Sequence, residues 1–207
     1  MRDTADLASD GRLARGERTR RQLAEALISL LEDGIAEPTA REVSARAGVS
    51  LRLVFHHFDD MEQLLRAAVK VQVERHWDHL RPVDPSLPVG ERVAQIVRQR
   101  ESLFEAISPV RRAAARVEAA SPTVAGELSN ARLVLRRAVQ RAFGPELQAA
   151  GPARAELLDA LEAAASWETW DQLRRRMGLG PAAARRVVIR TLISLLESTK
   201  SPGGSGR

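Results

Sequence analysis

The side chains of this chain best suited to contact another molecule lie in "TAREVSARAGVSLRLVFHHF", from Thr39 to Phe58. Leu51, Arg52, Phe55 and His56 follow one another closely after a Gly-Val-Ser turn. Arginine donates to phosphates and to base edges, and leucine contacts thymine methyl groups. Three uses are therefore open for this stretch: a protein core, a metal site built on histidine, or a surface that contacts a partner.

The metal and catalytic uses have little support. His56 and His57 are adjacent and point in different directions on a helix. His76 and His79 have i, i+3 spacing, but the chain has no cysteine and no evident third ligand. We also find no glycine-rich phosphate loop and no nucleophile motif. We expect no metal, no cofactor and no enzymatic activity; a helical hydrolase or lyase is the alternative from a different class.

Helices position this stretch, because helical periodicity is present throughout and nothing indicates a strand. We predict a helix over residues 15–32, ended at Gly34, and a second over 39–47 that opens with the capping box Thr39–Glu42. Ser50 caps a third helix that runs to residue 56. Asp60 then starts a fourth helix, with Gln63 completing another capping box, that extends to about residue 80.

Two short helices separated by Gly48 form a helix-turn-helix. We expect a positive φ at Gly48 and packing of Val49 between the helices. The face that carries Leu51, Arg52 and Phe55 is too large for a three-helix domain to cover. The major groove of DNA would receive such a face.

The segment from about Arg18 to Lys70 resembles the DNA-binding domain of TetR-type bacterial transcriptional regulators. The matching residues are "TRRQLAEAL", "PTAREVSARAGVS", "LVFHHF" and "DDMEQLL", about a quarter of the chain. The resemblance implies an all-α fold of about nine helices, with an N-terminal three-helix domain followed by a helical ligand-binding and dimerisation domain. It also implies a dimeric regulator, by default a repressor, that binds a palindromic operator and is released by a small-molecule effector.

The resemblance assigns DNA contacts residue by residue. These are Arg18, Arg20, Thr39, Arg41, Ser50, Leu51, Arg52, Leu53, Phe55, His56 and His57. Two positions depart from the usual pattern of the family: Phe55 replaces a tyrosine and Met61 replaces a lysine. Both changes remove a phosphate contact, so we expect weaker DNA binding that depends on a flexible basic arm, residues 1–16. A ligand-binding protein with weakened or lost DNA binding is the alternative.

Charge and composition agree with a soluble protein. The net charge is +5. Residues 1–80 contain 12 basic and 14 acidic residues, a net charge of −2, and residues 81–207 contain 20 basic and 13 acidic residues, a net charge of +7. DNA binding by the first part therefore depends on local arginine clusters rather than bulk charge. No apolar run is long enough to cross a membrane and no signal peptide is evident, so we expect a cytoplasmic location.

The proline-rich "RPVDPSLP", residues 81–88, predicts a boundary between domains. We expect a helix-turn-helix domain with its linking helix over 17–80, an effector-binding and dimerisation domain over 81–199, and a disordered tail over 200–207. Helices are predicted near 90–107, 110–120, 123–143, 153–177 and 181–198, separated by Ser-Pro and Gly-Pro pairs.

Arg100 falls within the apolar stripe of the predicted helix 90–107. Its guanidinium either pairs with an acidic side chain, which is the simpler explanation, or serves as counter-ion for an anionic effector. The large aromatic residues after it belong either to the core or to an effector cavity. The effector-binding candidates are Arg100, Phe104, Phe143, Trp167 and Trp170.

The last predicted helix is apolar on two adjoining faces, so we expect one to pack on its own chain and the other to form a homodimer as a four-helix bundle. The predicted interface residues are Leu158, Leu161, Val188, Leu192 and Leu195. In such a dimer the two DNA-contacting helices (the reading helices, which follow Ser50 in each subunit) would lie about 34 Å apart, one turn of DNA.

Overall fold

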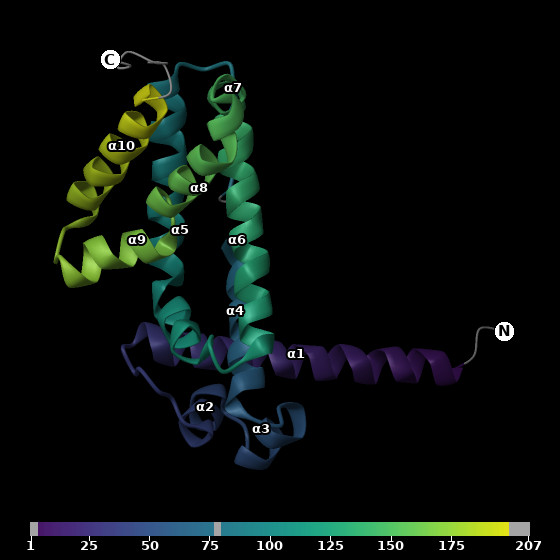
Figure 1. Cartoon of the computed structure of the whole chain (residues 1–207). Helices are drawn as coiled ribbons and strands as arrows, with labels where there is room; N and C mark the ends of the chain where they lie inside the picture. Colours follow the sequence, from purple (N-terminus) through teal and green to yellow (C-terminus); the bar gives the residue numbers. More distant parts are fainter. Residues whose placement is uncertain (1–3, 77–79, 199–207) are drawn as a thin grey trace, which may run out of the picture. The chain divides into compact units, whose positions relative to one another are not determined.

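The computed structural model describes residues 4–76 and 80–198, and side chains from residue 14 onward. All regular structure in these residues is helical, which confirms the predicted all-α class (Figure 1). The predicted tail, residues 200–207, lies outside the described residues, as does His79. None of the described helices is long and apolar enough to cross a membrane.

Helices α1 to α4 follow the N-terminal prediction closely. Their bounds are α1 Thr4–Glu32, α2 Ala40–Ala47, α3 Leu51–His57 and α4 Met61–His76. Gly34, with φ +88°, ends α1: its N–H donates to Leu31 O and that of Ile35 to Leu30 O, which is the Schellman pattern. The start of α1 differs from expectation, because residues 4–16, predicted as a flexible arm, continue the same helix.

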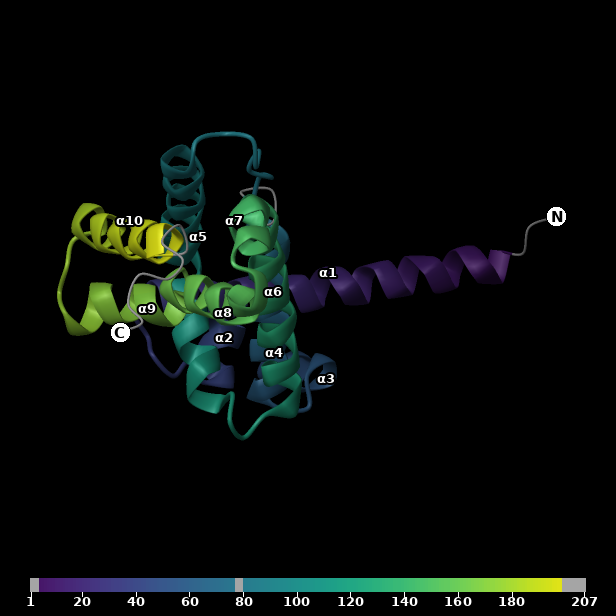
Figure 2. The same ribbon diagram turned by 45° about the horizontal axis from the view of Figure 1, so that its top comes forward.

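The second half of the chain is also helical. Its α-helices are α5 Val89–Val117, α6 Pro122–Ala142, α7 Gly144–Ala149, α8 Arg154–Ala164, α9 Trp167–Asp171 and α10 Pro181–Ser198. A π-helical turn, Gln172–Arg176, follows α9. Helices α8 to α10 can be followed in Figure 2. The predicted helices 123–143 and 181–198 are confirmed within one residue.

Two predicted helix boundaries in this half are wrong. Pro109 was expected to separate two helices, but it lies inside α5. A proline there removes one backbone hydrogen bond, at a cost of about 3 kcal/mol, which burial of Val110, Ala113 and Ala114 in the following turns offsets. Conversely, the predicted helix 153–177 is interrupted at Ser166, whose Oγ accepts the N–H of Thr169 and starts α9.

The chain forms two compact units whose composition differs from the predicted split at residues 80 and 81. The first unit contains residues 1–75 and 107–130, and the second contains 76–106 and 131–207. Helices α5 and α6 therefore each contribute residues to both units. The connection over 81–88 is not helical, and it carries a buried Val83 and an Asp84 carboxylate that accepts from the N–H and hydroxyl of Ser86.

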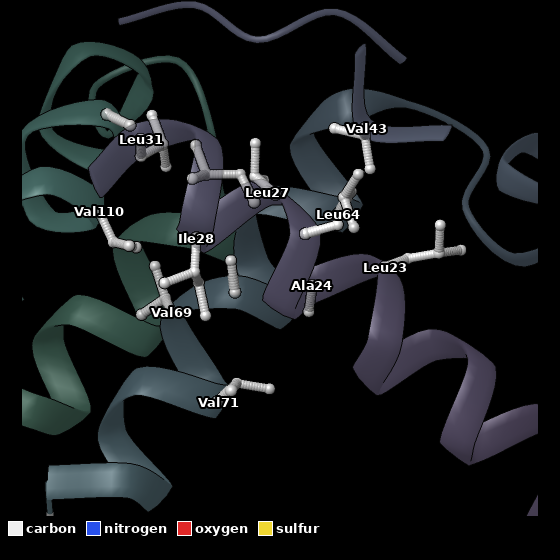
Figure 3. Close-up of a cluster of buried hydrophobic side chains, with 14 of the residues drawn as sticks. Leu23, Ala24, Leu27, Ile28, Leu31, Val43, Leu64, Val69, Val71 and Val110 are labelled. Atoms are coloured by element: carbon white, nitrogen blue, oxygen red, sulfur yellow. The ribbon is translucent and has the colours of Figure 1, made fainter. Parts of the chain in front are cut away.

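One apolar cluster holds the first unit together (Figure 3). Helix α1 supplies Leu23, Leu27 and Ile28, and α4 supplies Leu64 and further aliphatic side chains. Residues Val110, Ala113 and Ala114 of α5 and Val124 and Leu128 of α6 complete it. A domain built from helices α1 to α3 alone would have a small apolar core, and residues 107–130 enlarge that core.

Candidate nucleic-acid interface

The turn between α2 and α3 is fixed by backbone hydrogen bonds around Gly48. The φ angle of Gly48 is +68°, its N–H donates to Ala45 O, and the N–H of Val49 donates to Ser44 O at 3.0 Å. A residue with a β-carbon is strained at that angle, which explains the glycine. Val49 is half-buried against the apolar cluster, as predicted.

Side-chain hydroxyls cap the two helices of the motif. Thr39 accepts the N–H of Glu42, and the Glu42 carboxylate accepts the Thr39 N–H at 2.7 Å, so the predicted capping box is present. The two hydrogen bonds from Thr39 lower the pKa of Glu42. Ser50 accepts the N–H of Leu53 at 3.3 Å. Thr39, Arg41 and Ser50 are all solvent-exposed.

Helix α3 separates an inward residue from an exposed face. Val54 is buried in the core of the first unit. On the opposite face, the exposed fraction is 36% for Leu51 and 52% for Phe55, and Arg52 and His56 are also exposed. Large apolar side chains exposed beside a guanidinium and an imidazole form a contact surface rather than a core. The sequence-predicted residues of α3 thus lie together on one face, except Leu53 and His57, which are half-buried.

Arg20 has a structural role that the sequence did not indicate. Its Nη1 donates to the backbone oxygen of His57, and its guanidinium carbon lies 4.3 Å from the centroid of the Phe58 ring. Both contacts hold the C-terminal end of α3 on α1. Arg20 is therefore engaged within the protein, whereas Arg18 is exposed. Burial, together with the positive charges of His56 and Arg20, lowers the pKa of His57.

Met61 begins α4 and is half-buried against the apolar cluster of the first unit. Asp60 Oδ1 caps this helix by accepting the N–H of Gln63 at 2.8 Å. The second half of the predicted capping box is replaced, because the Gln63 amide donates to the carboxylate of Asp59 instead. The carboxylates of Asp59 and Asp60 thus lie just before α4, and Met61 occupies the position where the family commonly has a lysine.

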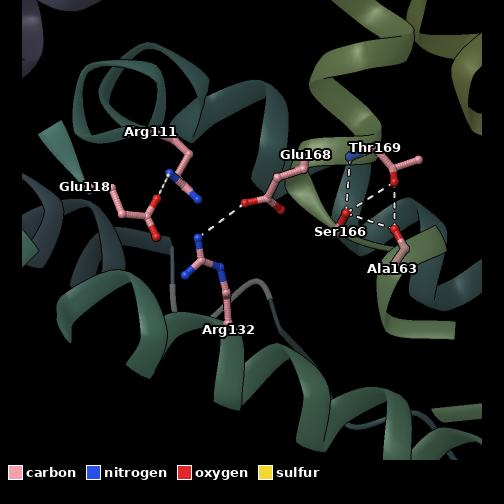
Figure 4. A network of polar contacts seen from close by, with 7 residues as sticks. All are labelled: Arg111, Glu118, Arg132, Ala163, Ser166, Glu168 and Thr169. Atoms are coloured by element: carbon pink, nitrogen blue, oxygen red, sulfur yellow. Dashed lines mark hydrogen bonds and ion pairs between the residues drawn. The ribbon is translucent and has the colours of Figure 1, made fainter. Parts of the chain in front are cut away.

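Hydrogen bonds connect these N-terminal helices to the segment 107–130 of the same unit. Ser121, which caps α6 by accepting the N–H of Val124, donates its hydroxyl to the Glu62 carboxylate of α4. Arg116 of α5 donates to the backbone oxygen of Ala36, in the loop before α2. The Arg111 guanidinium binds Glu118 at 3.3 Å (Figure 4).

The five effector candidates are all buried in the second unit. Phe143 lies beside Arg92, 5.8 Å from that guanidinium carbon, and the Trp170 indole N–H donates to Glu105 at 2.8 Å. Arg100 approaches Phe104, with 5.9 Å between guanidinium carbon and ring centroid. Phe143 and Trp170 therefore contact α5 at two separate positions, Arg92 and Glu105, while Arg100 and Phe104 belong to that helix itself.

Ion pairs connect α6 with the helices that follow it in this unit. Arg136 binds both Asp159 and Glu162 of α8. Figure 4 shows the other pair, between Arg132 and Glu168 of α9. Both acidic partners raise the pKa of Arg136.

Four of the five predicted dimer residues lie in the interior of the single chain. Leu158, Leu161, Val188 and Leu192 are buried within a single chain, because α8 and α10 pack on each other. Leu195, the fifth predicted residue, is half-buried. The larger aliphatic residues that remain accessible on α10 are Val187, 40% exposed, and the half-buried Ile189, Ile193 and Leu195.

The described helices include a capped helix-turn-helix whose second helix, α3, exposes apolar and basic side chains, and this is the architecture of a helix-turn-helix domain. Residues 23–68 match the sequence model of a family described as bacterial regulatory proteins, tetR family, within the segment 18–70 whose residues resemble such a domain. Among the described residues, no group of three histidine, cysteine, aspartate or glutamate side chains is arranged to hold a metal ion.

One curated relative is similar to part of this chain in sequence, and two solved structures are similar to it in fold. The HTH-type transcriptional regulator PksA of Bacillus subtilis is 34% identical over 83 residues, which cover 39% of this chain and 40% of the relative. The chain thus matches less than half the length of that protein. A transcriptional regulator from Rhodococcus is similar in fold, with TM-score 0.69, 21% identity, and coverage of 86% of this chain and 96% of its own. A TetR-family regulator from Streptomyces coelicolor has TM-score 0.65 and 19% identity, and covers 88% of this chain and 82% of its own.

Proposed function

We propose that the protein is a dimeric, ligand-responsive transcriptional repressor that binds a palindromic operator and has no enzymatic activity. The exposed face of α3 carries this proposal. Leu51, Arg52, Phe55 and His56 project from a helix whose opposite side is fixed by Val54 and by its caps. Such a face offers a guanidinium for guanine and apolar atoms for thymine methyls. A cytoplasmic location follows, because the operator lies there.

Dimerisation supplies the second reading helix. We place the interface on the accessible side of α10, at Val187, Ile189 and Ile193, together with exposed small residues of α8. Two copies of these helices would form a four-helix bundle. The exposed Val187 in particular gains by burial against its symmetry mate.

Control by a ligand requires a path from the second unit to α3. Helices α5 and α6 run through both units, and their shared segment contacts α4 through Ser121 and Glu62, and the loop before α2 through Arg116. A ligand that shifts α5 or α6 in the second unit would therefore change the contacts that position α3 in the first unit. A coupling free energy of about 1–3 kcal/mol is sufficient for a workable switch.

The test is selection of bound sequences from a library of random duplex DNA by the purified full-length chain. We expect an enriched palindrome with half-sites about one helical turn apart. A folded dimer that enriches no sequence at low salt would refute the DNA-binding function.

That result would favour the second candidate, a helical ligand-binding protein without an operator. Three observations point to it: Phe55 lacks a phenolic hydroxyl, Met61 is packed inward where a cation would stand, and Arg20 is engaged by His57 and Phe58. Each removes a phosphate contact, worth about 1.5–3 kcal/mol for a hydrogen bond to a charged group.

A further inference from the structure

Arg100 is a buried cation with most of its hydrogen-bonding capacity unused. It lies on α5 in the second unit and is 3% exposed. Its Nη2 donates to the backbone oxygen of Leu135 at 2.8 Å. Its Nε and Nη1 have no acceptor among the described residues. A guanidinium has five N–H donors, so the structure leaves at least half of them unsatisfied.

Arg92, two turns earlier on α5, shows how this fold satisfies a buried arginine. It is 4% exposed and makes a two-pronged pair with Glu146 at 2.7 and 2.6 Å. Two further N–H groups donate to the backbone oxygens of Leu87 and Ala142. The charge and four of the five N–H groups of Arg92 are therefore matched within the chain, in contrast to those of Arg100.

Among the residues that the structure describes, no acidic side chain is bonded to Arg100 in this way. Burial lowers the pKa of Arg100 to about 10, and the negative charge of Glu162 only partly opposes this effect. Glu162 itself is bonded to Arg136, which also binds Asp159. The pairing of Arg100 with an acidic residue, expected from the sequence as the simpler explanation, is thus not what the structure contains. Arg100 remains protonated at neutral pH and lacks a bonded counter-ion.

The surroundings of Arg100 along its helix are apolar. Ile96 and Val97 precede it by one turn, Leu103 and Phe104 follow by one turn, and all four are buried. A molecule whose polar group reaches Arg100 must therefore place its remaining atoms against aliphatic and aromatic side chains. Desolvation also strengthens a charge-assisted hydrogen bond at this point.

We infer that Arg100 binds the carboxylate of an organic monoanion with an apolar body. One carboxylate matches the single charge of Arg100 and supplies acceptors for its free N–H groups. A phosphate dianion would leave one negative charge buried and unmatched. The further step, that this acid is the effector, rests on the proposed function and on the continuation of the Arg100 helix into the first unit. The binding site itself does not depend on the proposed function.

The experiment uses the full-length protein and a panel of straight-chain monocarboxylates of about 6 to 14 carbons with 4-phenylbutyrate, each paired with the alcohol of the same skeleton. Binding is measured by calorimetry and by the shift in melting temperature. We expect at least one acid to bind saturably and its alcohol to bind at least tenfold more weakly. Saturable binding by none of the acids, or equal binding of acid and alcohol, overturns the inference.

Two variants on α5 locate the site. Arg100→Met should weaken binding of the acid roughly 10- to 100-fold, as expected for loss of a charge-assisted hydrogen bond. Its melting temperature without ligand should equal or exceed that of the parent, because an uncompensated buried charge is removed. Arg98→Met, at an exposed position of the same helix, is the control and should change neither quantity. Unchanged affinity in Arg100→Met, or a marked loss of its stability, would make Arg100 a structural residue and overturn the inference.

Operator binding separates this inference from the proposed function. Acid binding through Arg100 by a protein that selects no operator upholds the site and refutes the regulator. Operator selection by a protein that binds no acid upholds the regulator and refutes the site.

Discussion

Replacing Phe55 by tyrosine should tighten operator binding. The ring is 52% exposed on the face of α3 that we propose contacts DNA, so the added hydroxyl meets solvent in the free protein. Its effect on folding should therefore lie within about 0.5 kcal/mol. In the complex the phenolic O–H would donate to a phosphate oxygen, a contact that phenylalanine cannot make.

The expected gain in operator affinity is estimated for the proposed dimer, in which residue 55 occurs twice. A hydrogen bond to a charged acceptor contributes about 1.5–3 kcal/mol. At an exposed position the lower value applies, and two copies of residue 55 give about 3 kcal/mol. Since about 1.4 kcal/mol is a factor of ten, the Phe55→Tyr dimer should bind roughly 100-fold more tightly.

The assay is fluorescence anisotropy with the selected palindrome at several salt concentrations. Phe55→Tyr adds a neutral donor, so the slope of log K against log salt should stay unchanged. Met61→Lys adds two cations per dimer and should steepen that slope by about 1.8. Phe55→Leu is the control and should not tighten binding. Affinity of Phe55→Tyr within twofold of the parent would show that residue 55 faces no phosphate.

Three further outcomes are expected. Arg92→Met should lower the free energy of unfolding by about 3–5 kcal/mol in urea titrations, because Glu146 is left buried without its guanidinium, and Glu146→Met in the same chain should restore most of the loss. Val187→Arg should shift sedimentation toward the monomer without destabilising the chain, since residue 187 is exposed within one subunit. The lowered pKa of His57 means that the unfolded chain binds the proton more readily. Thermal stability should therefore fall as the pH drops below about 6.5, and less so in His57→Gln.

The local features of the reading motif were predictable from sequence because their causes are local. The cap residues Thr39 and Ser50 and the positive φ of Gly48 each depend on atoms within four positions along the chain. These parts of the candidate site required no knowledge of distant contacts.

The features that escaped prediction depend on distant contacts. Continuation of α5 through Pro109 depends on packing of the next two turns in the first unit. Arg20 was expected on DNA, but its partner is 37 residues away in sequence. The inward face of α10 could not be chosen from two apolar faces without knowing where α8 packs. Arg100 was expected to find an acidic partner, and its nearest candidate is taken by Arg136.

The packing of residues 107–130 into the first unit limits which segments can be exchanged between such proteins by recombination. A chimera that joins residues 1–75 of this chain to the remainder of a relative would lose Val110, Ala114 and Val124 from the apolar cluster, as well as the Ser121 contact to Glu62. Recombination at a single point therefore separates side chains that fold together. Specificity for an operator would transfer intact only in a two-segment graft that carries 107–130 with it, so the reading motif and this hairpin are expected to be inherited as one block.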